Sequence, residues 1–137
     1  VIARKKWWLP FMEGHIKVGE NDVVVGWSSG AIAAMRYAEW HKIRGSVLVG
    51  PSASDLGDEL EKQSGYFDEP WQWQKIKDNQ QHVAIVHSDN DPFIPQEQFA
   101  IIKKELSPDV VLLPGRGHFI DEATFPELLD YILKTYP

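Results

Sequence analysis

The hydrophobic positions of the chain gather in four short runs, with longer amphipathic stretches between them. The four runs are rich in Val, Ile and Leu and do not alternate strictly with polar residues: Asp22–Gly26, Gly45–Gly50, His82–His87 and Asp109–Leu113. Such runs are typical of strands that are buried on both faces of a parallel sheet. We therefore expect four strands in one mostly parallel sheet.

Three of the stretches between and after the four runs show helical patterns. The expected helices are Gly30–Ile43, Gln96–Leu106 and Glu122–Tyr136. Pro95 precedes the second helix, where proline suits the first turn. The third helix carries its large apolar residues on one stripe. Strands that alternate with helices predict an α/β fold, a parallel sheet flanked by helices with right-handed crossovers.

The composition limits the class of protein. The 137 residues are 43% hydrophobic, which suits one domain over residues 1–137 with its own core. A formal charge of −6 offers no basic surface for nucleic acid and no cationic face for a membrane. Without cysteine, the chain cannot form disulfides or cysteine-bound zinc. No run is long enough to span a membrane and no signal-peptide pattern opens the chain, so we expect a cytoplasmic protein.

Residues that could take part in catalysis follow the predicted strands, at the edge of the sheet where α/β proteins have their active sites. Gly26-Trp27-Ser28-Ser29-Gly30 matches the G-x-S-x-G pattern of a tight strand-to-helix turn that exposes a serine nucleophile. Both glycines are expected to be necessary, because a Cβ at either position would collide across the turn. The Ser29 backbone N–H would then face an incoming oxyanion. The alternative is an ordinary turn in which a serine caps the helix.

A serine nucleophile needs a base, and the base needs a carboxylate that orients it. The loop after the third strand offers Asp91, which Pro92 holds in an extended backbone, and Asp89 as the second choice. Alternatively, both aspartates could only stabilise the turn through hydrogen bonds to its backbone. No calcium-loop spacing is present.

His118 is the expected base, because Gly115 and Gly117 free the backbone before it and a strand delivers it to the same sheet edge. The other histidines have no such setting: His15, His41, His82 and His87. No pair of them has metal-ligand spacing, so no metal site is expected. Ser28, Asp91 and His118 follow one another in the chain order of the α/β-hydrolases.

The sequence resembles the retinoblastoma-binding protein 9 family of serine hydrolases, which have a small α/β-hydrolase fold. The matching stretches are "WLPFME" (8–13), "GWSSGAIAAMRYAEWH" (26–41), "SDLGDE" (54–59), "SGYFDEPWQWQKIK" (64–77), "DNDPFIP" (89–95) and "GHF" (117–119). The resemblance implies Ser28 as nucleophile, Asp91 as acid and His118 as base.

The chain departs from the family at three places. Trp27 stands where close relatives usually carry His, and its side chain is expected to affect the shape of the substrate pocket more than the chemistry. Ile16-Lys17-Val18-Gly19-Glu20 lacks the Leu and Cys of the Leu-x-Cys-x-Glu signature, so we do not expect binding to a retinoblastoma-type pocket. Family members also begin with a further strand and a glycine-rich loop that supplies a second oxyanion donor. The chain is thus expected to be N-terminally truncated, and a weak hydrolase by itself.

Residues 51–81 interrupt the alternation of strands and helices and are rich in aromatics. Tyr66, Phe67, Trp71 and Trp73 fall within eight positions. One interpretation is a lid whose aromatics, chiefly Phe67, Trp71 and Trp73, form a pocket wall over Ser28 for an apolar acyl group. The other is a satellite cluster that packs this segment onto the body. If the segment is extended, Trp71 and Trp73 should face opposite sides.

These features together predict a serine hydrolase that cleaves an ester, thioester or amide of a small acyl substrate through an acyl-enzyme. No metal or organic cofactor is implied. The competing hypothesis is an interaction protein that keeps the fold but has weak or no turnover.

Overall fold

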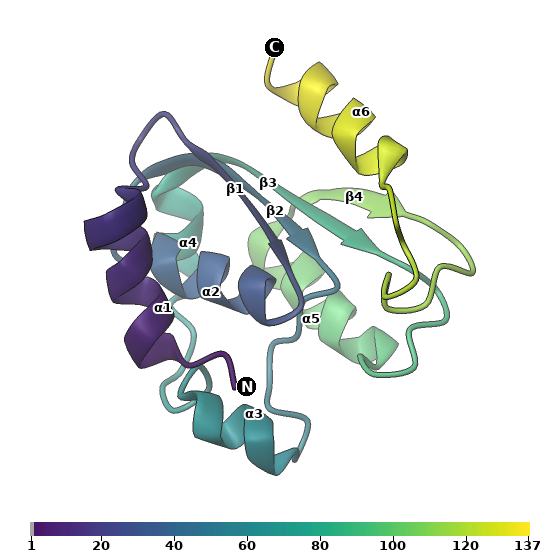
Figure 1. Ribbon diagram of the computed structural model, residues 1–137, viewed down its shortest axis with the longest axis horizontal. Helices are drawn as coiled ribbons and strands as arrows, with labels where there is room; N and C mark the ends of the chain where they lie inside the picture. Colours follow the sequence, from purple (N-terminus) through teal and green to yellow (C-terminus); the bar gives the residue numbers. More distant parts are fainter. Residues whose placement is uncertain (1) are drawn as a thin grey trace.

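A parallel sheet forms the centre of the protein, whose computed structural model describes residues 2–137 (Figure 1). Its strands are β1 Val23–Trp27, β2 Ile43–Val49, β3 Gln80–His87 and β4 Asp109–Leu112. Each strand runs parallel to the next, in the order β1-β2-β3-β4. The four predicted strands and their common direction are confirmed.

Both faces of the central strands are buried. Leu48 of β2 and Ile85 of β3 belong to the larger of two hydrophobic clusters. Their chain neighbours Val49 and Val86 point to the opposite face, where they form a second cluster with residues near the C-terminus. Because successive side chains of a strand alternate between faces, this double burial explains why the apolar runs are uninterrupted.

Helices cover both faces of the sheet. The larger cluster includes residues of α2 (Ser29–Ala38), α4 (Trp73–Asp78) and α5 (Gln96–Leu106), while α6 (Pro126–Thr135) lies over the other face (Figure 1). The bounds predicted for α5 are confirmed.

The helix predicted over Gly30–Ile43 is too long, because α2 ends at Ala38. The N–H of Ile43 instead donates to the carbonyl of Asn79, 2.9 Å away, as β2 begins. Pairing with β3 therefore overrides the helical spacing of Ile43.

A helical segment precedes β1 that the hydrophobic pattern did not indicate. It consists of α1 (Lys5–Phe11) and a π-helical turn, Met12–Ile16. Pro10 lies inside α1 and lacks a backbone donor, and Trp7 is 66% exposed. Proline and exposed aromatics obscure the amphipathic pattern by which a helix is recognised.

A buried arginine ties the irregular segment 51–81 to the body. Arg36 of α2 is 1% exposed and forms an ion pair with Glu39 at 2.6 Å. It also donates to the backbone carbonyl of Tyr66 at 2.7 Å, and its guanidinium lies 3.6 Å from the ring centre of Trp71. The charge is thus satisfied by protein groups instead of water, which fixes the segment on α2.

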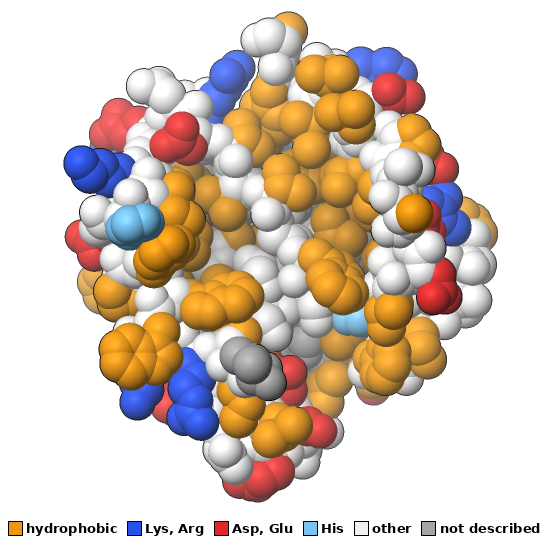
Figure 2. Space-filling model, viewed as in Figure 1, with side chains coloured by type: hydrophobic (Ala, Val, Ile, Leu, Met, Phe, Trp, Pro, Cys, Tyr) orange, Lys and Arg blue, Asp and Glu red, His pale blue; other side chains and the backbone are white. Residues whose placement is uncertain are grey.

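β1 is an edge strand in the part of the chain that the structure describes. Val25 of β1 is 46% exposed, and Leu129 and Leu133 of α6 are also exposed. Figure 2 shows hydrophobic side chains across the middle and top of one face, with most charged side chains at its rim. The sheet face beside β1 is therefore only partly covered by α6.

Candidate active site

Ser28 occupies a strained turn between β1 and α2. Its φ and ψ of 53° and −117° are unusual for a residue with a side chain. Its N–H donates to the carbonyl of Val49 in the neighbouring strand at 2.8 Å, which holds the turn against β2. The strand–turn–helix context that we predicted from the sequence is present.

The two glycines of the turn have different roles. A Cβ on Gly26 would lie 2.2 Å from the carbonyl oxygen of Gly30, so only glycine fits at this position. A Cβ on Gly30 would meet only the ring of Trp8, at 4.0 Å. The expectation that both glycines prevent a collision is correct for Gly26 and wrong for Gly30, because the Cβ position of Gly30 points away from the β1 backbone.

The side chain of Asp91, in the loop after β3, is completely buried. Its Oδ1 accepts hydrogen bonds from the N–H groups of Phe93 and Ile94, at 2.8 and 2.9 Å. Its Oδ2 lies 2.6 Å from Nδ1 of His118. The backbone donors fix the carboxylate so that one oxygen is presented to the imidazole.

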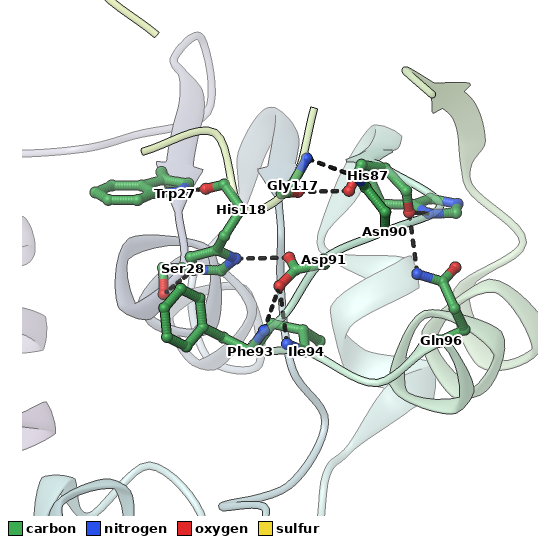
Figure 3. A network of polar contacts seen from close by, with 11 residues as sticks. Trp27, Ser28, His87, Asn90, Asp91, Phe93, Ile94, Gln96, Gly117 and His118 are labelled. Atoms are coloured by element: carbon green, nitrogen blue, oxygen red, sulfur yellow. Dashed lines mark hydrogen bonds and ion pairs between the residues drawn. The ribbon is translucent and has the colours of Figure 1, made fainter. Parts of the chain in front are cut away.

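His118 joins the two other predicted residues. Its Nε2 lies 3.0 Å from the Oγ of Ser28, on the opposite side of the ring from Asp91 (Figure 3). The imidazole is 8% exposed. With Nδ1–H donating to the carboxylate, Nε2 is left as an acceptor for the serine hydroxyl. The structure thus brings Ser28, His118 and Asp91 together in hydrogen-bonding order.

Asp89, the second choice for the acid, has another partner. Its Oδ1 accepts from the N–H of Gly115 at 2.8 Å, and Asn90 accepts from the N–H of Gly117 at 2.8 Å. The hydroxyl of Ser88 donates to the carbonyl of Gly117. Three successive side chains of the Asp91 loop therefore hold the backbone of the loop that carries His118.

Gly50 is a site residue that sequence reasoning missed. It follows β2 with a φ of +55°, and a Cβ there would lie 3.1 Å from Cε1 and 3.2 Å from Nδ1 of His118. A side chain at this position would press on the imidazole. Gly50 is the last residue of a predicted strand, at the edge of the sheet that holds the catalytic residues, and this position could have indicated it.

An open cleft of about 750 Å³ lies beside Ser28. Trp27 and His118 line it, as do Ser29 and Gly50. Its wall also includes large apolar side chains from several segments: Trp8, Ile32, Leu56, Leu60, Phe93, Ile94 and Ile120. A cleft with this lining suits a mainly apolar group next to the serine.

Three aromatics predicted for the pocket wall lie elsewhere. Phe67, Trp71 and Trp73 are absent from the lining of this cleft and pack against the larger hydrophobic cluster. Trp71 donates from its indole to the carbonyl of Ala53 at 2.8 Å and stacks on Trp73, with ring centres 5.3 Å apart. The prediction of a pocket wall is wrong for these three. Trp71 and Trp73 were expected to face opposite sides only in an extended segment, and this condition is not met, because Trp73 begins α4. The stacking on Arg36 draws Trp71 toward α2, away from Ser28.

Two carboxylates stand at the cleft, Asp58 and Glu61. Partial burial raises the pKa of Glu61, and the neighbouring charges of Asp58 and Asp55 raise it further. Within residues 2–137, no Lys or Arg side chain is among those that line the cleft. The charged part of the lining is therefore acidic.

The other histidines have partners away from Ser28. His15 stacks on Phe11, His41 on Tyr37 and His87 on Phe99. His82 contacts Asp109 at 2.8 Å and the hydroxyl of Tyr136 at 2.7 Å, where α6 meets the sheet. Over the described residues no three His, Asp or Glu side chains are grouped to hold a metal ion, and none of the described helices is long and apolar enough to cross a membrane.

The parallel sheet and the serine turn at its carboxyl edge are those of an α/β hydrolase. Solved structures of similar fold agree. The ydeN gene product of B. subtilis superposes with a TM-score of 0.84 at 22% identity, covering 97% of this chain and 75% of that chain. A carboxylesterase of Nitrososphaera gargenis gives a TM-score of 0.74 at 13% identity, covering 96% and 71%. These likenesses show the fold.

Sequence comparison identifies the family. The profile described as "Serine hydrolase" matches residues 2–132, so the chain belongs to this family. The rat protein "Serine hydrolase RBBP9" is 45% identical over 129 residues, which are 94% of this chain and 69% of that protein. The resemblance inferred from the short motifs is therefore confirmed.

Proposed function

We propose that this serine hydrolase cleaves an ester, thioester or amide of a small acyl substrate, with Ser28 as nucleophile, His118 as base and Asp91 as acid. One observation carries the proposal. His118 stands between Ser28 Oγ at 3.0 Å and Asp91 Oδ2 at 2.6 Å, and the serine has a strained backbone and lines a cleft. Such geometry is the signature of an activated serine.

The reaction begins when Nε2 of His118 takes the proton of Ser28 and Oγ attacks the substrate carbonyl. Asp91 stabilises the resulting imidazolium through Nδ1–H. As the tetrahedral intermediate collapses, the imidazolium returns the proton to the leaving group and an acyl-enzyme remains. Water, deprotonated by the same imidazole, then releases the acid and restores the serine.

The oxyanion of the intermediate needs hydrogen-bond donors. Ser29 is the first residue of α2 and lines the cleft. The N–H groups of a first helical turn have no acceptor inside the helix, and the helix dipole favours negative charge there. Ser29 N–H is therefore the donor that we assign to the oxyanion, as the sequence predicted.

The cleft restricts the substrate. Its large apolar side chains favour an apolar acyl or leaving group, and Trp27 is the one predicted pocket aromatic that lines it. Its charged lining residues, Asp58 and Glu61, disfavour an anionic group. We therefore expect p-nitrophenyl butyrate or octanoate to be hydrolysed faster than an ester of a dicarboxylic acid such as mono-p-nitrophenyl succinate.

Labelling with a fluorophosphonate probe tests the nucleophile, because the probe requires an activated serine. The parental chain should be labelled and Ser28→Ala should not. His118→Gln should lower ester turnover by about 10³-fold or more, since an attacking serine without its base loses most of its reactivity. His41→Gln is the matched control, because His41 stacks on Tyr37 and is not among the residues lining the cleft.

Two results would contradict the proposal. If the folded parental chain is not labelled, the competing hypothesis of an interaction protein gains support. If Ser28→Ala is labelled as strongly as the parent, another residue is the nucleophile.

A further inference from the structure

Trp27 contacts the base directly. It is the last residue of β1 and comes immediately before Ser28. Its indole N–H donates to the backbone carbonyl of His118 at 2.9 Å, and the ring centres of Trp27 and His118 are 5.6 Å apart (Figure 3). The residue next to the nucleophile thus holds the residue that activates it.

The backbone around His118 depends on such contacts. His118 lies between Gly117 and Phe119, whose φ angles are +56° and +60°, so it belongs to no helix or strand that would fix its direction. Ser88 and Asn90 hold Gly117 from the side of the Asp91 loop. The bond from Trp27 comes from the side of Ser28.

These two sets of contacts position His118 relative to different residues. The bonds from Ser88 and Asn90 relate His118 to Asp91, because Ser88 and Asn90 belong to the same loop as Asp91. The bond from Trp27 relates His118 to Ser28, because Trp27 and Ser28 share one peptide bond. The distance between Nε2 and Oγ is the one that decides proton transfer.

We propose that Trp27 is a positioning residue, which sets the His118 imidazole relative to Ser28 Oγ through its indole N–H. This inference rests on the proposed function of the site. It revises the expectation that Trp27 affects the shape of the pocket more than the chemistry. A residue that shaped the cleft alone would need its ring but not its N–H.

Trp27→Phe separates the two roles, because phenylalanine keeps an aromatic ring and lacks the donor. We expect kcat for a p-nitrophenyl ester to fall about 3- to 10-fold, the effect of losing one hydrogen bond, while KM changes less than about twofold. Trp7→Phe is the matched control. Trp7 is 66% exposed and does not line the cleft, so its variant should keep the parental kcat and KM.

A second readout does not require turnover. In chains that also carry Ser28→Ala, ¹⁵N resonances of the imidazole report its orientation and hydrogen bonds, and His118→Gln assigns the signal. We expect Trp27→Phe to shift or broaden the His118 nitrogen signals and Trp7→Phe to leave them unchanged.

The results distinguish this inference from the proposed function. If the parental chain hydrolyses esters and Trp27→Phe raises KM without lowering kcat, Trp27 shapes the cleft only and the inference is wrong. Unchanged kcat together with unchanged His118 signals also overturns it. If the parental chain is not labelled by a fluorophosphonate, the proposed function fails, and the nitrogen signals still decide whether Trp27 orients the ring.

Discussion

The carboxylate of Asp89 accepts a hydrogen bond from the N–H of Gly115, 2.8 Å away, and so braces the loop that carries His118. Asp91, two residues later, contacts the His118 imidazole itself. Two acidic residues of one loop thus act on the same histidine in different ways. One holds the backbone before it and the other holds its ring.

Asparagine variants should separate these roles. Asp91→Asn should lower kcat by about 10³- to 10⁴-fold, because an amide favours the wrong imidazole tautomer. Asp89→Asn keeps an oxygen that can accept from Gly115, so ester turnover should stay within about threefold of the parent. Steady-state kinetics on one p-nitrophenyl ester measures both. A larger loss for Asp89→Asn than for Asp91→Asn would reverse the assignment.

Alanine at the two glycines of the serine turn should affect stability differently. Gly26→Ala should destabilise the fold by about 3 kcal/mol or more, since its Cβ would overlap the Gly30 carbonyl and backbone cannot move aside cheaply. Gly30→Ala should be neutral or stabilising by up to about 1 kcal/mol, because alanine favours the helix and has room. Urea unfolding followed by circular dichroism measures both. Equal losses would mean that the turn does not have this geometry.

Removal of the Arg36 side chain should lower the stability of the fold far more than removal of a surface charge. Arg36→Met leaves the buried carboxylate of Glu39 without its cation and should lower the free energy of unfolding by about 3–5 kcal/mol. Adding Glu39→Gln should recover part of this loss. Lys5→Met is the control, because Lys5 approaches the exposed Glu69 only at 3.8 Å and such pairs contribute less than about 1 kcal/mol. Similar losses in Arg36→Met and Lys5→Met, measured by urea unfolding, would contradict the anchoring role.

Stability should fall as the pH drops below about 6.5, with His87 contributing. Burial lowers the pKa of His87 below the value of the unfolded chain, so the unfolded state takes up a proton that the folded state does not. The loss begins at the unfolded pKa near 6.5 and continues down to the lowered folded pKa. In His87→Gln the difference in unfolding free energy between pH 7.5 and 5.5 should be smaller than in the parent. The control is His15→Gln, because His15 is exposed. If the difference in unfolding free energy between the two pH values is the same in His87→Gln as in the parent, the prediction is wrong.

Retinoblastoma-type pockets should not bind the segment Ile16–Glu20. The segment lacks the Leu and Cys of the signature, and Lys17 within it has a left-handed backbone with a φ of 62° after the π-helical turn. Isothermal titration calorimetry with a retinoblastoma pocket domain should give no measurable heat. Micromolar binding that disappears in Glu20→Ala would contradict this expectation.

The sequence by itself determined the sheet and the three residues that meet at its edge. Apolar runs without alternation require burial on both faces, and helices between them make the strands parallel, so the residues after each strand must meet. Ser28, Asp91 and His118 could be chosen because glycines and a proline mark the loops that hold them. Such signals lie in residues that are neighbours along the chain, so the sequence is sufficient to recognise them.

Only the tertiary structure decided which neighbours complete the site. Asp89 and Asp91 both follow β3. Asp89 contacts the backbone of Gly115 and Asp91 contacts the ring of His118, because of the way the two loops pack against each other. Trp71 faces α2 because a buried guanidinium from a distant helix lies on its ring. Trp27 reaches a carbonyl 91 positions away. Contacts of this kind join segments that are remote along the chain, and neither periodicity nor spacing encodes their geometry.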